Sequence, residues 1–380
     1  MSQLNVDTIK KADGTGSLTV PAETGTVVTT ASPSLGRRNL IINGAMQVFQ
    51  RGSSVNTHNA FAVDRFQLQL DSTDQLAISL NQDSDAPAGY SYSSKITINT
   101  AETAIASDEK ALIRTCLEGN TIAHLGWGTS DAEAVNLSFW VKSSATGTYS
   151  AVLVWGSSGA NQRSYTGQYT INTANTWERK TISVPADTDG TYSLETGTGR
   201  GIQIRWTFGA GSAETTGTAN AWASVNTSGA STDDEFITTA NATWQITGVQ
   251  LEVGSVATPF EHRSYGEELA LCQRYFFRSQ GTEAYTAHGL GANFDGDTSD
   301  LFIHYPVPMR ARPDITFSGT VSFHRGAGTN TNVTNMGDAG GSTTCSFIRC
   351  DHGNVFTTGD AVYCINNNDA SGEISFNAEL

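Results

Sequence analysis

The chain has 380 residues, of which 38% are hydrophobic and only 16% charged, while glycine contributes 38 residues and proline 8. Ordinary globular domains carry about 25% charged residues, so a composition this rich in glycine and small polar residues favours short strands joined by tight turns and excludes long helices. The formal net charge of −15 argues against a nucleic-acid-binding protein, because phosphate contacts need clustered lysines and arginines and only 22 are present.

Membrane insertion and export are not expected either. No run approaches the roughly 18 apolar residues of a membrane helix, and the first residues lack the basic start and apolar run of a secretion signal. The five cysteines form an odd, widely spaced set that does not resemble a disulfide framework: Cys116, Cys272, Cys345, Cys350 and Cys364. We expect synthesis in a reducing cytoplasm.

The first segment, residues 1–38, is polar and contains only short alternating pieces on either side of the turn Gly14-Thr15-Gly16. Such a segment cannot bury a core of its own. It is therefore either disordered or ordered by docking on a partner, and the sequence leaves both possibilities open.

Period-2 hydrophobic patterns recur from about residue 39 to 262, and each run ends in Gly, Asn, Asp or Ser. This spacing predicts a β-sandwich or barrel. The last run, 244–253, changes phase at Gly248, which predicts a β-bulge there. Three tryptophans lie within apolar alternation and are expected in the core: Trp140, Trp206 and Trp244.

A helix is predicted over 265–277, with acidic residues early and an apolar face formed by Leu269, Cys272, Tyr275 and Phe276. It would link two β units and occupy residues 263–278. Short alternating runs return over residues 279–380, which predicts a second, smaller β domain.

The run from Arg38 to Gly52 (RNLIINGAMQVFQRG) resembles the opening of a family of bacteriophage tail-fibre and virion structural proteins. Further motifs of that family follow in order, and we place them at Leu117–Asn120, Leu125–Thr129, Leu137–Ser144, Asn175–Glu178, Ile246–Gly254 and Thr258–Glu261. The resemblance covers roughly residues 39–278. Residues 279–380 match no family motif.

The resemblance implies a carbohydrate-binding-module-like jelly roll over 39–262. It also implies a 1–38 arm that docks on other tail or capsid proteins, and a 279–380 domain for receptor binding or trimerisation. The expected particle component is a homotrimeric fibre, made in the host cytoplasm and located on the virion. Similar modules hold a structural calcium, but this chain has Gln47 in the opening motif and only Glu252 in the last strand, so no metal or cofactor is predicted.

Sugars stack on exposed aromatic rings, so aromatic side chains outside regular apolar alternation are candidates for ligand contact. Trp222 is the first candidate for ligand or receptor contact, because it lies in the long Gly/Ala/Thr/Asn stretch 209–234, where it either faces the ligand or holds the loop down. Trp127 between two glycines is a weaker candidate, as are Tyr165 and Tyr169 in a polar, hairpin-like piece.

An enzyme is not predicted. A depolymerase needs two carboxylates about 5–10 Å apart in a cleft, whereas the contiguous cluster Asp233-Asp234-Glu235 and the turn 295–300 are expected to be solvated. The cysteines at 345, 350 and 364, with His352, lack zinc spacing and are expected to be buried thiols. The favoured function is attachment to a host glycan or protein receptor, with neutral sugars favoured by the acidic charge balance. A structural protein of the tail or capsid and a polysaccharide-degrading tailspike are the alternatives.

Overall fold

The computed structural model describes residues 37–52, 54–73, 75–156, 162–280, 283–326 and 328–380, together with the backbone of two short strands near the start. The chain divides into two compact units, 1–38 and 39–380. In the first unit β1 (Ile9–Lys10) and β2 (Ser17–Leu18) pair antiparallel. The rest of the predicted docking arm, up to residue 36, lies outside the described residues.

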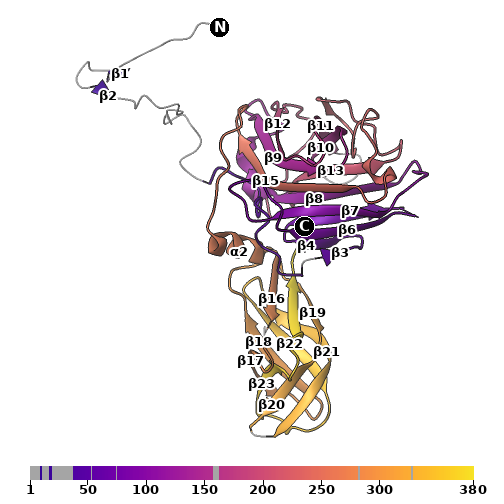
Figure 1. Ribbon diagram of the computed structural model, residues 1–380. Helices are drawn as coiled ribbons and strands as arrows, with labels where there is room; N and C mark the ends of the chain where they lie inside the picture. The colour runs from indigo at the N-terminus through magenta and orange to yellow at the C-terminus, as the bar shows by residue number, and fades with distance from the viewer. Residues whose placement is uncertain are drawn as a thin grey trace. The chain divides into compact units, whose positions relative to one another are not determined.

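The second unit is nearly all β, as the sequence predicts, and begins with a jelly-roll-like sandwich of two antiparallel sheets (Figure 1). In order across the seven-stranded sheet, the strands are β14 (Trp222–Ala223), β11 (Gln162–Ile171), β10 (Gly147–Gly156), β13 (Arg200–Ala210), β8 (Lys110–Glu118), β5 (Phe66–Asp71) and β4 (Ala60–Val63). The six-stranded sheet contains β12 (Glu178–Val184), β9 (Val135–Ser143), β15 (Thr243–Val253), β7 (Ser93–Thr100), β6 (Ala77–Asp83) and β3 (Ser54–Val55).

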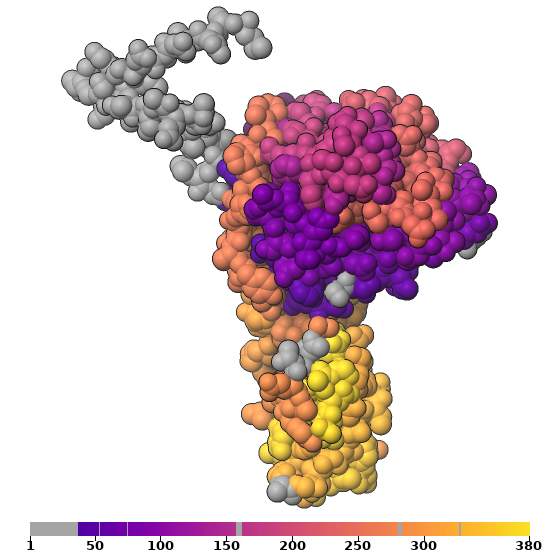
Figure 2. Space-filling view, in the orientation of Figure 1, coloured from indigo at the N-terminus to yellow at the C-terminus, as the bar shows by residue number. Residues whose placement is uncertain are grey.

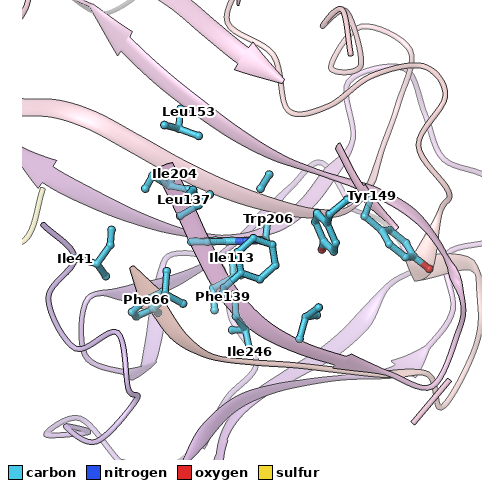
Figure 3. Close-up of a cluster of buried hydrophobic side chains, with 14 of the residues drawn as sticks. Ile41, Phe66, Ile113, Leu137, Phe139, Tyr149, Leu153, Ile204, Trp206 and Ile246 are labelled. Carbon is cyan, nitrogen blue, oxygen red and sulfur yellow. The ribbon is translucent and has the colours of Figure 1, made fainter. Parts of the chain in front are cut away.

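The core lies between the two sheets and is filled by the inward-facing half of each alternating strand (Figure 3). Trp206 and Trp244 are buried in this core, as predicted. The prediction for Trp140 is wrong, because this side chain is only partly buried. Its neighbours on β9, Phe139 and Val141, belong to the core, so the strand period places Trp140 on the opposite face.

Two of the segments that carry the resemblance, the opening run and the last strand β15, meet at one place in the sandwich. The backbone N–H of Leu40 donates to the carbonyl of Leu251 at 2.9 Å, and the side chain of Asn39 bonds both to this last strand and to its own neighbours. Gly44 lies against the same strand, where a Cβ would collide with the carbonyl oxygen of Val249. We call this contact between the opening run 39–44 and strand β15 the seam.

The predicted bulge at Gly248 is confirmed. The pairing of β15 with β9 shifts register between Thr247 and Gln250, and Gly248 has φ +61°, a conformation that costs other residues energy. The bulge lets Trp244 and Ile246 before it and Val249 and Leu251 after it all face the core. Glu252, the acidic residue that this strand could offer to calcium, instead accepts hydrogen bonds from Thr258.

Helix α2 (Tyr265–Gln273) begins at the predicted residue, with Ser264 as N-cap. It ends four residues earlier than predicted, because the chain turns and enters a strand at Phe276. The predicted apolar face is retained in part: Cys272 and Tyr275 are buried with Leu269 packed against them, whereas Phe276 begins the next strand. The other helices described are single turns: α1 (Gly119–Ile122), η1 (Ala123–Leu125) and η2 (Phe236–Thr238). No helix in the described part of the chain has both the length and the apolar character needed to cross a membrane.

The remaining residues form a second β body, orange to yellow in Figure 2. Its three-stranded sheet contains β16 (Phe276–Gln280), β24 (Glu373–Asn377) and β19 (Asp314–Ser318). Its closed barrel contains β17 (Ala287–Asn293), β18 (Thr298–His304), β22 (Cys345–His352), β21 (Thr329–Gly341), β20 (Val321–Arg325) and β23 (Ala361–Asn366). This body has its own apolar core. The division into separate domains at residues 262 and 278 stays a prediction.

The end of the chain returns to the sandwich. Glu379 forms ion pairs with Arg65, in the turn between β4 and β5, and with Arg51 at 2.9 Å. Arg274 at the end of α2 forms a second link, a bidentate pair with Glu118 on β8 at 2.6 and 2.7 Å. Ion pairs therefore join the second β body and its linker to the sandwich.

Candidate functional site

Three of the four aromatic residues predicted to contact a ligand lie in the core. Trp127, Tyr165 and Tyr169 are only 1%, 5% and 6% exposed, so the prediction that they offer a surface for stacking is wrong. The ring of Tyr169 packs edge-on against Phe139, at 5.1 Å between centroids, and burial raises the pKa of its hydroxyl well above the ordinary value.

The reason for this error is the alternation of β11. Its outward residues, such as Ser164 and Thr166, make the strand read as a polar hairpin, whereas Tyr165 and Tyr169 occupy the inward positions. Trp127 enters the sandwich core from a short loop, and its indole N–H donates to the carbonyl of Glu133 at 2.8 Å.

Trp222 lies at the edge of the seven-stranded sheet and is half-buried. Its ring packs edge-on against Trp127 and Tyr165, at 5.2 and 5.4 Å between centroids, and its indole N–H donates to the carbonyl of Pro185 at 2.9 Å. The side chain therefore holds the loop against the sandwich, which is one of the two roles expected from its sequence context. Its contact with a ligand stays a prediction.

The acidic cluster at 233–235 does not form a facing pair. Asp234 accepts from the backbone of Thr148, Asp233 from that of Ala230, and Glu235 from that of Ala210. The three carboxylates thus serve three different partners. Glu235 differs from the expected solvated charge, because its pKa is raised to about 7: burial is the largest cause, the hydrogen bond from Ala210 opposes it, and Asp233 and Asp234 add to it.

The metal-capable residues of the second β body are held by other contacts. Cys350 and Cys364 are buried in its core, as expected, and Cys345 is partly buried. Burial raises the pKa of the Cys350 thiol to about 12. Asp295 accepts from Thr298 inside its own turn, and Asp300 pairs with Arg349 at 2.9 Å.

The surface that combines rigid support with accessible polar groups is the outer side of the seven-stranded sheet. Inward residues of β5, β8 and β13 fill the core, so the alternate residues face outward. Gln67, Arg114 and Arg205 are consecutive partners across these three strands and form a transverse row. We call this row, together with Gln203 and Arg200, the polar outer face.

Amide groups orient the guanidinium groups of this face. The Nε–H of Arg114 donates to Oε1 of Gln67, and the Nε–H of Arg205 donates to Oε1 of Gln203, each at 2.6 Å. Arg205 also donates through Nη1 to Asn226 and to the carbonyl of Thr227, both at 2.8 Å. The loop that carries these acceptors therefore borders the polar outer face.

A β-bulge adds Arg200 to the same face. The pairing of β13 with β8 shifts register between Arg200 and Ile202, with Arg200 opposite Glu118. A bulge changes the direction in which the preceding side chains point. Arg200 therefore lies on the same face as Gln203 and Arg205, although strict alternation along the strand would place it on the opposite face. Beside this face a small hollow is lined by residues that include Arg65, Gln67, Arg114, Cys116 and Glu379.

The second β body presents a different surface. Leu290, Phe302 and Phe347 are consecutive partners on β17, β18 and β22, and they are 75%, 45% and 38% exposed. His304 packs edge-on against Phe302 at 4.7 Å. We call Leu290, Phe302 and Phe347 the apolar row.

No protein-family model and no curated protein sequence matches this chain. Similar solved structures include the enzymatically active domain of tailspike protein 4 of bacteriophage CBA120, at 14% identity and a TM-score of 0.32, where the match covers 57% of this chain but only 21% of that one. The C-terminal family 22 carbohydrate binding module of Clostridium thermocellum Xyn10B is similar at 11% identity and a TM-score of 0.31, covering 55% of this chain and 98% of the module.

The family 11 carbohydrate-binding module of Clostridium thermocellum Lic26A-Cel5E is similar at 12% identity and a TM-score of 0.28, covering 56% of this chain and 98% of that module. At these scores the similarities carry no argument about function.

Proposed function

We propose that this chain is a non-enzymatic fibre protein of a phage particle, which attaches the particle to glycans on the host surface. The phage assignment is supported by the ordered motifs over 39–278, and the seam supplies a physical reason for the motifs at 38–52 and 246–254. The glycan-binding role is supported by one observation: the polar outer face places oriented hydrogen-bond donors and acceptors on the central strands of a rigid sheet.

The physical basis is preorganisation. Sugar hydroxyls are recognised by fixed polar groups, and ordered side chains lose little further entropy on binding. Gln67 and Gln203 accept from the Nε–H groups of Arg114 and Arg205 and hold both guanidinium groups in place, and the partly exposed Arg114 and Arg200 offer donors to a ligand. Trp222 borders another part of the same sheet and supplies a partly accessible ring.

The test uses the intact chain in competition with the particle. Purified full-length protein should block particle adsorption to host cells, and an Arg114→Ala variant should block it at least about tenfold less well, because a charged hydrogen bond contributes about 1.5–3 kcal/mol. Arg312→Ala, an exposed arginine of the second β body, is the matched control. Equal blocking by all three proteins would place recognition elsewhere, and no blocking by any of them would refute the attachment role.

The non-enzymatic part has its own measurement. Incubating the full chain with purified host polysaccharide should release no reducing ends, since the acidic cluster at 233–235 has no facing pair. Release that is lost in Glu235→Gln would establish the polysaccharide-degrading alternative, because Glu235 has the raised pKa of a general acid.

A structural role in the particle is the second candidate, and the apolar row favours it. Contiguous exposed apolar side chains mark protein contacts, and a homotrimer would cover the row of each copy. Light scattering should give three times the chain mass for the native protein, and Phe302→Ser with Leu290→Ser should reduce it. A native mass of one chain would refute the homotrimer.

A further inference from the structure

The polar outer face gathers positive charge without matching carboxylates. Arg114 and Arg205 are direct partners on neighbouring strands, and like charges in directly opposite positions destabilise a sheet. Arg200 adds a third guanidinium, near enough to lower the pKa of both other arginines. We call Arg114, Arg200 and Arg205 the arginine cluster.

The donors of this cluster are incompletely used. Both η nitrogens of Arg114 and Nη2 of Arg205 have no hydrogen-bond partner among the described residues, and within the same ranges the Arg200 side chain has none. These nitrogens are not buried, because the buried side-chain atoms without a hydrogen-bond partner do not include them. They are therefore accessible donors.

The carboxylates near the arginine cluster form ion pairs with other residues. Asp71 and Glu214 both pair with Lys110, at 3.2 and 3.0 Å. Glu118 is held by Arg274, and Glu379 by Arg51 and Arg65. The protein as a whole carries −15, yet the cluster and Lys110 place four positive charges beside the two carboxylates of Asp71 and Glu214.

Arg205 is the most deeply buried member of the arginine cluster. Its side chain is only 6% exposed, and buried charges are normally paired with an opposite charge. Burial, followed by repulsion from Arg114 and Arg200, lowers the pKa of Arg205 to about 10. Its hydrogen bonds all go to neutral acceptors, so the site lacks the anion that its charges require.

We propose that the arginine cluster binds the carboxylate or sulfate group of an acidic glycan. This inference rests on the proposed glycan-binding function and specifies its ligand class. Planar guanidinium groups recognise such oxyanions by paired N–H donors. It also revises the expectation of neutral sugars, since the local charge at the site is opposite to the net charge of the chain.

The first arm of the experiment tests the anion site alone. Millimolar sodium sulfate should raise the melting temperature of the full chain above that in sodium chloride of equal ionic strength, since ligands that bind only the folded state stabilise it. The gain should fall in Arg114→Gln and in Arg200→Gln, two half-buried positions, but not in the control Arg312→Gln. An equal gain in all four proteins indicates general salt exclusion only and overturns the anion site.

The second arm identifies the source of the anion. Full-length protein is titrated with pairs of glycans that differ only in charge: polygalacturonate against its methyl ester, and chondroitin sulfate against chondroitin. The acidic member of at least one pair should bind about tenfold or more tightly, with this preference lost in both variants and retained in Arg312→Gln.

The outcomes separate the two claims. Equal binding of acidic and neutral members overturns this inference and leaves the glycan-binding function standing. Sulfate stabilisation that depends on the cluster, without binding of any glycan, shows a site for a free inorganic anion and overturns both the ligand class and the glycan-binding function.

Discussion

The link between Glu379 and Arg65 allows a quantitative test of how the end of the chain is held. Arg65 is buried, its guanidinium lies 3.4 Å from the centre of the Tyr275 ring, and it donates to the carbonyl of Cys116 at 2.6 Å. Glu379→Gln removes its only ion-pair partner among the described residues. We expect the free energy of unfolding to fall by about 3–5 kcal/mol, because a buried charge is left uncompensated.

The assay is urea unfolding of the full chain followed by tryptophan fluorescence. A second variant, Arg65→Met with Glu379→Gln, should recover part of the loss, since replacing both members of a buried pair by uncharged groups is often nearly neutral. Recovery is incomplete because the Cys116 carbonyl also loses its donor. Asp338→Asn, which breaks the exposed pair with Arg312, is the control and should cost about 0–1 kcal/mol.

A loss below about 1 kcal/mol for Glu379→Gln, equal to that of the control, would refute the reasoning. So would a double variant that is as unstable as the two single changes added together, because independent sites are additive and a true pair is not.

Three further predictions concern stability and assembly. The pKa of Glu235 in the folded chain is raised to about 7 from 4.5, so the folded state loses stability as the pH rises through this window and the carboxyl group ionises. Glu235→Gln should therefore stabilise the protein by about 1–2 kcal/mol at pH 8 and have little effect at pH 4. Thermal unfolding at the two pH values measures this difference. Gly44→Ala should cost about 1–3 kcal/mol through its collision with Val249 in the seam, whereas Gly266→Ala in α2, with open space around it, should be neutral or stabilising, and equal effects would contradict the role of the seam. Removing residues 1–38 should leave the melting temperature of the remainder unchanged and prevent incorporation into particles; truncated chains that copurify with particles would place the anchor elsewhere.

Local patterns predicted the sandwich, because strand alternation and turn residues act within a few positions. The bulge at Gly248 followed from a change of phase, and the start of α2 from its early acidic residues. Burial of Tyr165 and Tyr169 was missed because the outward residues of the same strand are polar, and alternation alone does not show which face meets the core.

The arginine cluster could be identified only once the fold was known. Arg114 and Arg205 are far apart in the chain, and only the register of β8 with β13 makes them partners. The net charge of −15 pointed to the wrong sign for this surface, since a sum over the chain holds no information on where charges lie. A sequence signal did exist in the outward parity of Gln203 and Arg205 beside the apolar Ile202, Ile204 and Trp206, but it identifies a partner only once the sheet order is known.

The seam has a mechanical consequence. Asn39 enters the sandwich and accepts from Arg263 through its carbonyl, while its N–H donates to Glu261 at 2.8 Å, so the first and last residues of the sandwich are bonded to each other directly. Tension applied along the chain between residue 38 and α2 is therefore carried by this short cross-link, without passing through the strands in between. The strands that form the polar outer face would therefore bear little of this force, and the face would keep its geometry under tension.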